Sequence, residues 1–382
     1  MYLCTMAGIY IHIPFCRQAC HYCDFHFSTT LKLKGDLVAA INTEAILRKD
    51  YLKGESISTV YFGGGTPSLL TKAELSSIIY TVRSLHTIDD GAEITLEANP
   101  DDLTLEKLTE LKALGINRLS IGIQSFIEQD LRFMNRAHNA EQAAECVKLA
   151  QQAGFNNISI DLIYGTQTLD DLDWIENVEK AITLGVQHIS AYALTVEPRT
   201  ALSKMIAAGK VAPANEEKAA VHFHKLVTML NAAGFEHYEI SNFALPGYRS
   251  QHNSSYWRGV QYLGLGPAAH SFNGKQRHSA IHNNALYIKE ITNRILPLEE
   301  EGLSLADRYN EYVMTTLRTI EGIDVDKLGQ LFGLQLQAYC MQEALPFVKE
   351  GRLTFLGNNL TLTRDGKFFA DGIASALFKI DE

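Results

Sequence analysis

Short apolar runs alternate with longer amphipathic stretches between residue 8 and about residue 240 of this 382-residue chain. The apolar runs predict strands at residues 9–13, 59–62, 93–97, 118–123, 159–163 and 188–194. Apolar positions that recur every three or four residues predict helices between them, including residues 36–51, 71–85 and 141–153. Strands that alternate with helices are typical of a parallel sheet. The fold class is therefore α/β, and six such units predict a partial (βα)6 TIM-like barrel.

The pattern changes twice after the predicted barrel. Residues 245–300 are loop-rich and contain many aromatic and histidine residues, which predicts a connector. The remaining chain has a helical pattern, two short strand-like runs at 353–356 and 360–362, and a closing helix. We therefore expect a barrel over residues 1–244, a connector over 245–300, and a C-terminal helical, winged-helix-like domain over 301–382.

Composition narrows the function classes. A hydrophobic share of 46% with 20% charged residues is typical of a globular protein with a large core. Acidic residues outnumber basic ones by 44 to 34, and the basic residues do not cluster, so we expect no nucleic-acid partner. We see no signal peptide and no apolar run of about 18 residues, so we expect a cytoplasmic protein with at most peripheral membrane contact.

Half of the six cysteines lie within eight residues, directly after the first predicted strand. Such a cluster in a reducing compartment indicates metal binding. Three thiolates, from Cys16, Cys20 and Cys23, are one fewer than a [4Fe-4S] cluster normally takes, so one iron would stay open to a ligand. A structural zinc site completed by His21 or His26 is the alternative.

The other three cysteines, Cys4, Cys146 and Cys340, stand alone in the sequence. We interpret them as small hydrophobic residues, because an isolated buried cysteine packs like one.

Glycine and polar residues follow the predicted strands at the ends where parallel α/β proteins gather their chemistry. Glycines let a backbone approach a charged amino-acid group closely, and carboxylates can accept hydrogen bonds from a ribose. Each of these residues, seen alone, is as readily explained by a turn or an ordinary surface side chain. The residues concerned are Gly64, Gly65, Thr66, Glu97, Gln124, Arg136 and Asp161.

The CxxxCxxC loop and the GGGTP sequence together resemble the radical S-adenosylmethionine (SAM) superfamily, and the resemblance covers nearly the whole chain. It implies that the open iron binds the amino and carboxylate groups of SAM. It also implies that cofactor-binding positions fall on the seven residues above and on Tyr10. Asp161 matches a position that serves a second SAM molecule in the related coproporphyrinogen dehydrogenases.

Two branches of that superfamily differ in function. The oxygen-independent coproporphyrinogen III dehydrogenases carry a further cysteine where this chain has Phe25, and they have an N-terminal segment before the first strand that we do not find here. The HemW-like haem chaperones carry an HNxxYW motif, which His252 begins in this chain. We therefore predict a haem carrier rather than a coproporphyrinogen III dehydrogenase, with Phe25 beside the cofactors and an unidentified haem-acceptor protein as partner.

His252 is the predicted haem ligand, because haem iron readily takes an axial imidazole. The alternative is that His252 hydrogen-bonds the connector to the barrel. His270, His278 and His282 are further candidate ligands in the same connector.

Overall fold

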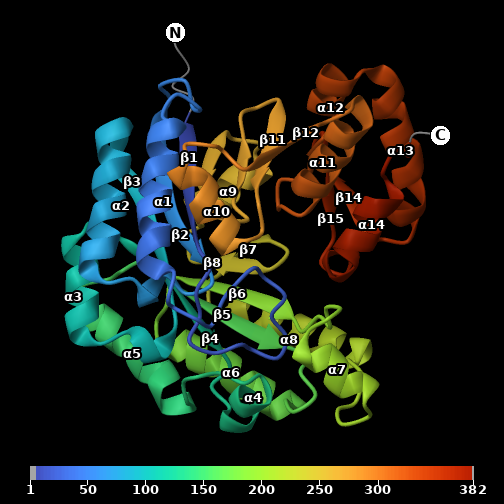
Figure 1. The fold of residues 1–382 in the computed structure, drawn as a ribbon. Coiled ribbons are helices and arrows are strands. Elements are labelled where there is room, and N and C mark those ends of the chain that lie inside the picture. The colour runs from blue at the N-terminus through green and yellow to red at the C-terminus, as the bar shows by residue number, and fades with distance from the viewer. Residues whose placement is uncertain (1–5, 381–382) are drawn as a thin grey trace.

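The computed structural model describes residues 6–380, so Cys4 lies outside the described residues. Parallel strands β1 to β6 lie side by side in chain order, and helices cover their outer face (Figure 1). This confirms the predicted barrel. Its elements are β1 (Met6–Ile13), α1 (Lys34–Leu47), β2 (Ser56–Gly64), α2 (Lys72–Leu85), β3 (Ile88–Ala98), α3 (Leu105–Ala113), β4 (Arg118–Gln124), α4 (Glu128–Phe133), α5 (Ala140–Gln152), β5 (Ile158–Tyr164), α6 (Asp171–Thr183) and β6 (His188–Ala193).

Local sequence signals explain where the barrel helices begin. In α2 the Thr71 side chain accepts a hydrogen bond from the Glu74 backbone, and the Glu74 carboxylate accepts one from the Thr71 backbone. This reciprocal pair satisfies two backbone donors that the first helical turn leaves free. Helix α5 begins with the same arrangement at Asn139 and Gln142. The strands are buried on both faces, which explains their nearly continuous apolar sequences.

Residues 245–300 are not rich in loops as predicted, because they contain regular elements that extend the sheet. Strand β9 (Tyr262–Leu265) pairs parallel to β1, and β10 (His270–Phe272), β11 (Gln276–Ala280) and β12 (Leu298–Gly302) continue antiparallel from it. Helices α9 (Gln251–Trp257) and α10 (Asn284–Thr292) accompany these strands. These strands were not predicted because they are only three to five residues long and because β11 and β12 are rich in polar side chains.

The opposite edge of the sheet is also extended. After β6 come α7 (Ala201–Ala207) and α8 (Glu216–Ala232), followed by β7 (Glu236–Glu239) and β8 (Asn242–Ala244). Strand β8 pairs antiparallel to β6, and β7 pairs with β8, which completes a 12-stranded sheet. The barrel is therefore an open, partial one with added strands at both edges.

The C-terminal domain has the predicted helices and wing. It comprises α11 (Leu305–Leu317), β13 (Ile323–Asp324), α12 (Val325–Phe332), α13 (Leu334–Lys349), β14 (Leu353–Leu356), β15 (Asn359–Leu362) and α14 (Ala370–Ala376). Its three strands form a separate small sheet in the order β13-β15-β14. Its buried residues form their own hydrophobic cluster, distinct from the barrel core. The domain boundaries remain predictions, and these separate cores support the one near residue 300.

Two of the isolated cysteines lie among the described residues. Cys146 and Cys340 are both buried and make no disulfide, and each packs in a hydrophobic cluster. Within residues 6–380, no helix is both long enough and apolar enough to cross a membrane.

Candidate functional site

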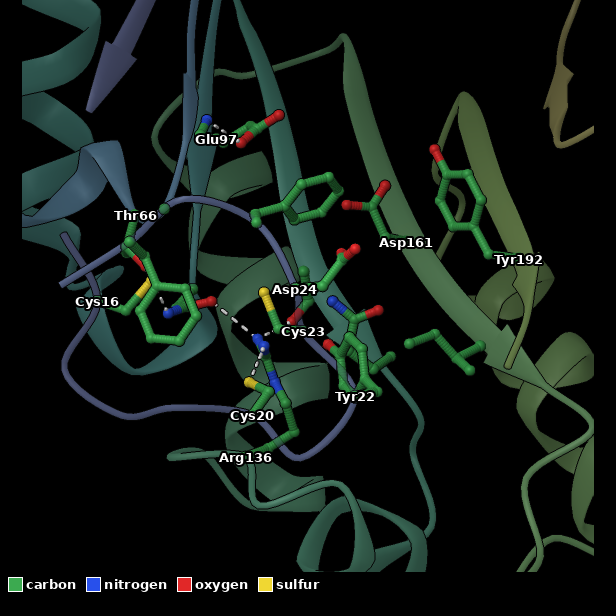
Figure 2. Close-up of a pocket in the computed structure, with 18 of the residues that line it drawn as sticks. Cys16, Cys20, Tyr22, Cys23, Asp24, Thr66, Glu97, Arg136, Asp161 and Tyr192 are labelled. Carbon is green, nitrogen blue, oxygen red and sulfur yellow. Dashed lines mark hydrogen bonds between the residues drawn. The ribbon is translucent and has the colours of Figure 1, made fainter. Parts of the chain in front are cut away.

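A cavity of about 450 Å³ opens at the carboxyl ends of the barrel strands. Figure 2 shows the cysteine loop on one side of it and the strand-end residues on the other. Most of the predicted site residues line this cavity. They are Cys16, Cys20, Cys23, Phe25, Gly64, Gly65, Thr66, Glu97, Gln124, Arg136 and Asp161.

The loop that carries the cysteines is anchored at both ends and at its centre. The Cys16 backbone N–H donates to the Ser28 carbonyl at 3.1 Å, which closes the loop after β1. At its centre the His21 backbone N–H donates to the Met134 carbonyl at 3.1 Å, beyond the end of α4. The three thiols are therefore held half-buried at one wall of the cavity.

Hydrogen-bond donors point at two of the cysteine sulfurs. Arg136 Nη1 donates to Cys20 Sγ at 3.2 Å, and Thr66 Oγ1 donates to Cys16 Sγ at 3.5 Å. Burial raises the pKa of the Cys23 thiol to about 11 and also raises that of Cys16, with the neighbouring cysteines adding to both shifts. Three thiols on one short loop, with donors directed at two of the sulfurs, fit the cysteine ligands of an iron–sulfur cluster.

Asn99 links two of these donors and was not predicted from the sequence. Its Nδ2 donates to Thr66 Oγ1 at 3.2 Å, and its Oδ1 accepts from Arg136 Nη2 at 2.8 Å. The Gly122 carbonyl accepts a further bond from Arg136 Nη2 at 2.7 Å. Asn99 follows Glu97 closely in the sequence EANP, so its position at a strand end was the available signal.

Both predicted cavity glycines are required by their neighbours. Gly64 has a φ of +110°, and a Cβ there would lie 2.6 Å from the His12 ring. A Cβ on Gly65 would lie 2.6 Å from the Phe15 carbonyl oxygen. The GGGTP turn can therefore pack against the start of the cysteine loop only with its backbone bare.

The carboxylate of Glu97 is oriented by two donors. Tyr61 Oη donates to Oε1 at 2.8 Å, and the Gly64 backbone N–H donates to Oε2 at 3.1 Å. Burial raises the pKa of Glu97 to about 7, despite the Tyr61 hydrogen bond, and the nearby Asp161 charge contributes to the rise. Burial likewise raises the pKa of Asp161 to about 6. Burial therefore favours the neutral, protonated form of both carboxyl groups.

Two further features shape the far side of the cavity. Gln124 ends β4 with a φ of +67°, a strained conformation for a residue with a side chain, and strained residues tend to occur at functional sites. Tyr192 on β6 lies across from Asp161 (Figure 2), is 44% exposed, and was not predicted. In sequence Tyr192 is indistinguishable from an ordinary strand tyrosine.

Tyr10 and His252 are not among the residues that line the cavity. The Tyr10 ring lies 6.3 Å from the His252 ring, and its hydroxyl lies 3.1 Å from His12 Nδ1. Tyr10 therefore lies behind the cavity wall, where it supports neighbouring aromatic rings.

His252 occupies the position that the alternative interpretation predicted. It is 2% exposed, its Nδ1 lies 2.7 Å from Thr59 Oγ1 on β2, and its Nε2 lies 2.8 Å from the Tyr256 hydroxyl. Its ring stacks on Tyr61 at 5.0 Å, and burial lowers the pKa of His252 to about 3. Both ring nitrogens have partners in this conformation, so His252 joins the connector to the barrel.

No three histidine, cysteine or acidic side chains among residues 6–380 are close enough together to hold a single metal ion. The cysteines share a cavity wall, which suits a multi-iron cluster whose irons each take one thiolate.

Comparison with known proteins agrees with the fold and the cysteine loop. The model of the radical SAM superfamily matches residues 10–181, and a model described as the HemN C-terminal domain matches residues 303–369. A solved structure of coproporphyrinogen III oxidase (HemN) from Escherichia coli, described as a radical SAM enzyme, aligns with a TM-score of 0.84 at 22% identity, over 98% of this chain and 90% of that one. The chain is a radical SAM protein, a class that implies a [4Fe-4S] cluster and SAM.

Curated relatives define the family more closely. The "Heme chaperone HemW" of Mycobacterium tuberculosis is 34% identical over 97% of this chain and 94% of its own length. The proteins of the same name from Bacillus subtilis and Escherichia coli are 31% and 30% identical, over 97% and 96% of this chain and 99% and 96% of their own lengths. This chain belongs to the HemW heme chaperone family.

Proposed function

We propose that this protein binds haem and transfers it to an acceptor protein, and that it carries a [4Fe-4S] cluster and SAM while doing so. The observation that carries this proposal is the similarity to heme chaperones over nearly the whole chain, connector and C-terminal domain included. The acceptor would be a protein that uses haem.

Within the proposal, the cysteine loop holds the cluster. Cys16, Cys20 and Cys23 would each ligate one iron, and the open iron would bind the amino and carboxylate groups of SAM. When bound, the cluster can supply the electron that cleaves the sulfonium of SAM. Arg136 and Thr66 donate to the sulfurs, which stabilises their thiolate charge.

The strand-end residues would hold the rest of SAM. The bare backbone of Gly64 and Gly65 gives its amino-acid part room beside the loop, and Glu97 would accept hydrogen bonds from the ribose hydroxyls. Gln124 and Asp161 face the same cavity and complete the polar lining. Tyr10 would not contact SAM but would support the neighbouring aromatic rings behind the cavity wall.

Oxidative decarboxylation of coproporphyrinogen III is the alternative function, because the fold is shared with a coproporphyrinogen III oxidase. Phe25 argues against it. Its ring stands where the dehydrogenases carry a further cysteine, lines the cavity and is 70% exposed. An apolar side chain there cannot supply a thiol.

The test is an anaerobic titration of the reconstituted protein with haem, followed by optical absorption, beside a coproporphyrinogen III turnover assay on the same sample. We expect stoichiometric haem binding, transfer to an apo-haemoprotein and no decarboxylated product. Product without specific haem uptake would contradict the chaperone proposal. Iron and zinc analysis of wild type, Cys20→Ser and the control Cys146→Ser separates the cluster from zinc, since Cys20→Ser alone should lose iron.

A further inference from the structure

Three histidines from distant segments gather beside the cysteine loop. His26 lies three residues after the last cluster cysteine, His270 begins β10, and His282 lies just before α10. The His282 ring lies 5.9 Å from the His26 ring and 6.5 Å from the His270 ring, measured between centroids. The gathering is a product of the fold, since β9 and its neighbours bring the connector to the β1 edge.

Two of these imidazoles are open to solvent and free to bind. His270 and His282 are exposed, and neither ring makes a hydrogen bond to any residue between 6 and 380. His26 Nε2 lies 2.7 Å from Asn284 Oδ1, so this ring is already hydrogen-bonded to the protein through one nitrogen. His278 differs, because its Nδ1 lies 2.9 Å from the Tyr51 hydroxyl. The rings of His278 and His252 therefore already have hydrogen-bond partners within the protein, whereas the rings of His270 and His282 have none among residues 6–380.

The turn that presents His270 is built on a buried ion pair. Glu44 of α1 and Arg48, which directly follows this helix, are 3.0 Å apart and almost fully buried. Arg48 Nη1 donates to the Gly264 carbonyl, and Glu44 Oε2 accepts from the Gly266 backbone N–H, both at 2.8 Å. Burying two charges costs several kcal/mol of desolvation unless their bonds are well placed. These two charges hold the glycine-rich turn in one conformation.

The same turn leaves no room for a side chain at Gly264 or Gly266, which precede His270. A Cβ on Gly264 would lie 2.0 Å from the His270 carbonyl oxygen, and one on Gly266 would lie 2.6 Å from the His12 carbonyl oxygen. The His12 ring in turn packs against Gly64 of the GGGTP turn. The histidine face is thus packed directly against the wall of the SAM cavity.

The chemistry of the face suits haem iron better than a bare metal ion. A bare ion takes several protein ligands, and no three candidate side chains within residues 6–380 are close enough to share one. Haem iron is already held by the porphyrin nitrogens and needs one axial imidazole from the protein.

We propose that the face formed by His26, His270 and His282 is a haem-binding site, with His270 or His282 supplying the axial imidazole. This inference rests on the proposed haem-chaperone function and names the residues that hold the haem. It places the haem at the surface, beside the cluster loop and behind the Gly64 turn, rather than at His252.

The experiment compares haem titrations of the reconstituted full-length protein, followed by optical absorption, for wild type and the double variant His270→Ala/His282→Ala. We expect the double variant to bind haem at least ten-fold more weakly and to lose the spectrum of imidazole-ligated iron. The single variants His270→Met and His282→Met decide which ring is the ligand, because a thioether ligand gives a different spectrum without loss of the fold.

His224→Ala on α8 is the matched control, since it removes another histidine from outside the three that form this face. It should bind haem like wild type. A double variant that binds haem with wild-type affinity and spectrum overturns the inference. If the double variant does not fold, unchanged spectra in both methionine variants overturn it equally.

The outcome for wild type separates this inference from the proposed function. If wild type does not bind haem, the chaperone proposal fails and the inference fails with it. If wild type binds haem and the histidine variants bind it equally well, the inference alone fails. A parallel titration with Zn²⁺ alone should show weak binding; Zn²⁺ binding tighter than haem through the same two histidines would make the face an ion site.

Discussion

Glu97 shows at the scale of one residue how the cavity orients a buried carboxyl group that a cofactor could contact. Its carboxyl group is held by Tyr61 and by the backbone of Gly64, in a setting whose burial raises its pKa. A carboxylic acid that is partly protonated near pH 7 is stabilised as an anion once a cationic or hydroxyl-bearing ligand arrives. In the cofactor-free protein, the two neutral donors to Glu97 therefore do not fully offset the cost of burying its negative charge.

The raised pKa of Glu97 makes the stability of the folded protein depend on pH. The pKa of Glu97 is about 7 in the folded protein, against a usual value of 4.5, so the folded state binds the proton more tightly. Stability that Glu97 contributes below pH 4.5 is therefore lost as pH rises towards 7. We expect cofactor-free Glu97→Gln to gain about 1–2 kcal/mol over wild type between pH 5 and pH 8, less than the full shift because water enters the cavity.

Urea denaturation of both proteins at the two pH values measures this gain. The control is Glu106→Gln, which changes an exposed carboxylate on α3. It should leave the pH dependence unchanged. A gain for Glu97→Gln that is equal at both pH values would mean that Glu97 is already ionised at pH 5.

Helix α9 shows at the scale of one element how a helix that carries a motif is attached to the barrel, and the role of His252 as haem ligand stays a prediction. Its residues match HNxxYW, yet its histidine faces β2 and its backbone is held there, since the His252 N–H donates to Glu93 Oε1 at 3.1 Å. In this conformation the helix connects the added strands to the barrel. His252 is an internal cross-link between them.

We expect His252→Ala to destabilise the protein by about 2–4 kcal/mol, because it empties a buried site and leaves the hydroxyls of Thr59 and Tyr256 without partners. His252→Gln keeps one hydrogen bond and should lose less. Equilibrium urea unfolding measures both, with His224→Ala as control. If His252→Ala keeps wild-type stability but loses haem, His252 is a ligand after all.

Elements were predictable from the sequence where burial on both faces makes a strand apolar throughout, as in β1 and β5. The connector strands were not, because β10 and β11 are short, lie towards the sheet edge and carry histidine and arginine. Most of the cavity residues could be predicted because they lie at or near the carboxyl ends of apolar strands, whereas Arg136 follows α4 and was found only through the family resemblance. The surroundings of His252 were not, since Thr59 lies 193 residues away in the chain.

Several polar contacts join the C-terminal domain to the rest of the molecule, among them the Arg249–Glu321 and Arg277–Glu311 ion pairs and the contacts of Arg318. Arg318, after α11, lies 3.8 Å from the buried Glu239 on β7, pairs with Asp371 at 2.8 Å and packs over the Trp257 ring at 5.4 Å. The Arg318 carbonyl also accepts from the Ile240 backbone N–H at 3.1 Å. Arg318 therefore binds the C-terminal domain to the barrel and to α9 at once.

We expect Arg318→Ala to weaken this attachment by about 2–3 kcal/mol, because it leaves the Glu239 carboxylate buried without its cation. Thermal unfolding should split into two transitions, and protease should cut sooner near residues 293–304. Arg352→Ala, which pairs with Glu350 inside the C-terminal domain, is the control. A single unshifted transition in Arg318→Ala would show that apolar packing alone holds the domain.

The parallel pairing of β1 with β9 has a consequence for the order in which the chain can fold. Residues 8–11 pair with residues 262–265, so about 250 residues separate the two partners. During synthesis β1 has an unpaired, apolar edge until the ribosome has made β9, and such an edge invites association with other chains. The segment that begins with β9 also carries His270 and His282, so a nascent chain covers the β1 edge at about the stage of synthesis at which it acquires two of the three histidines of the proposed haem site.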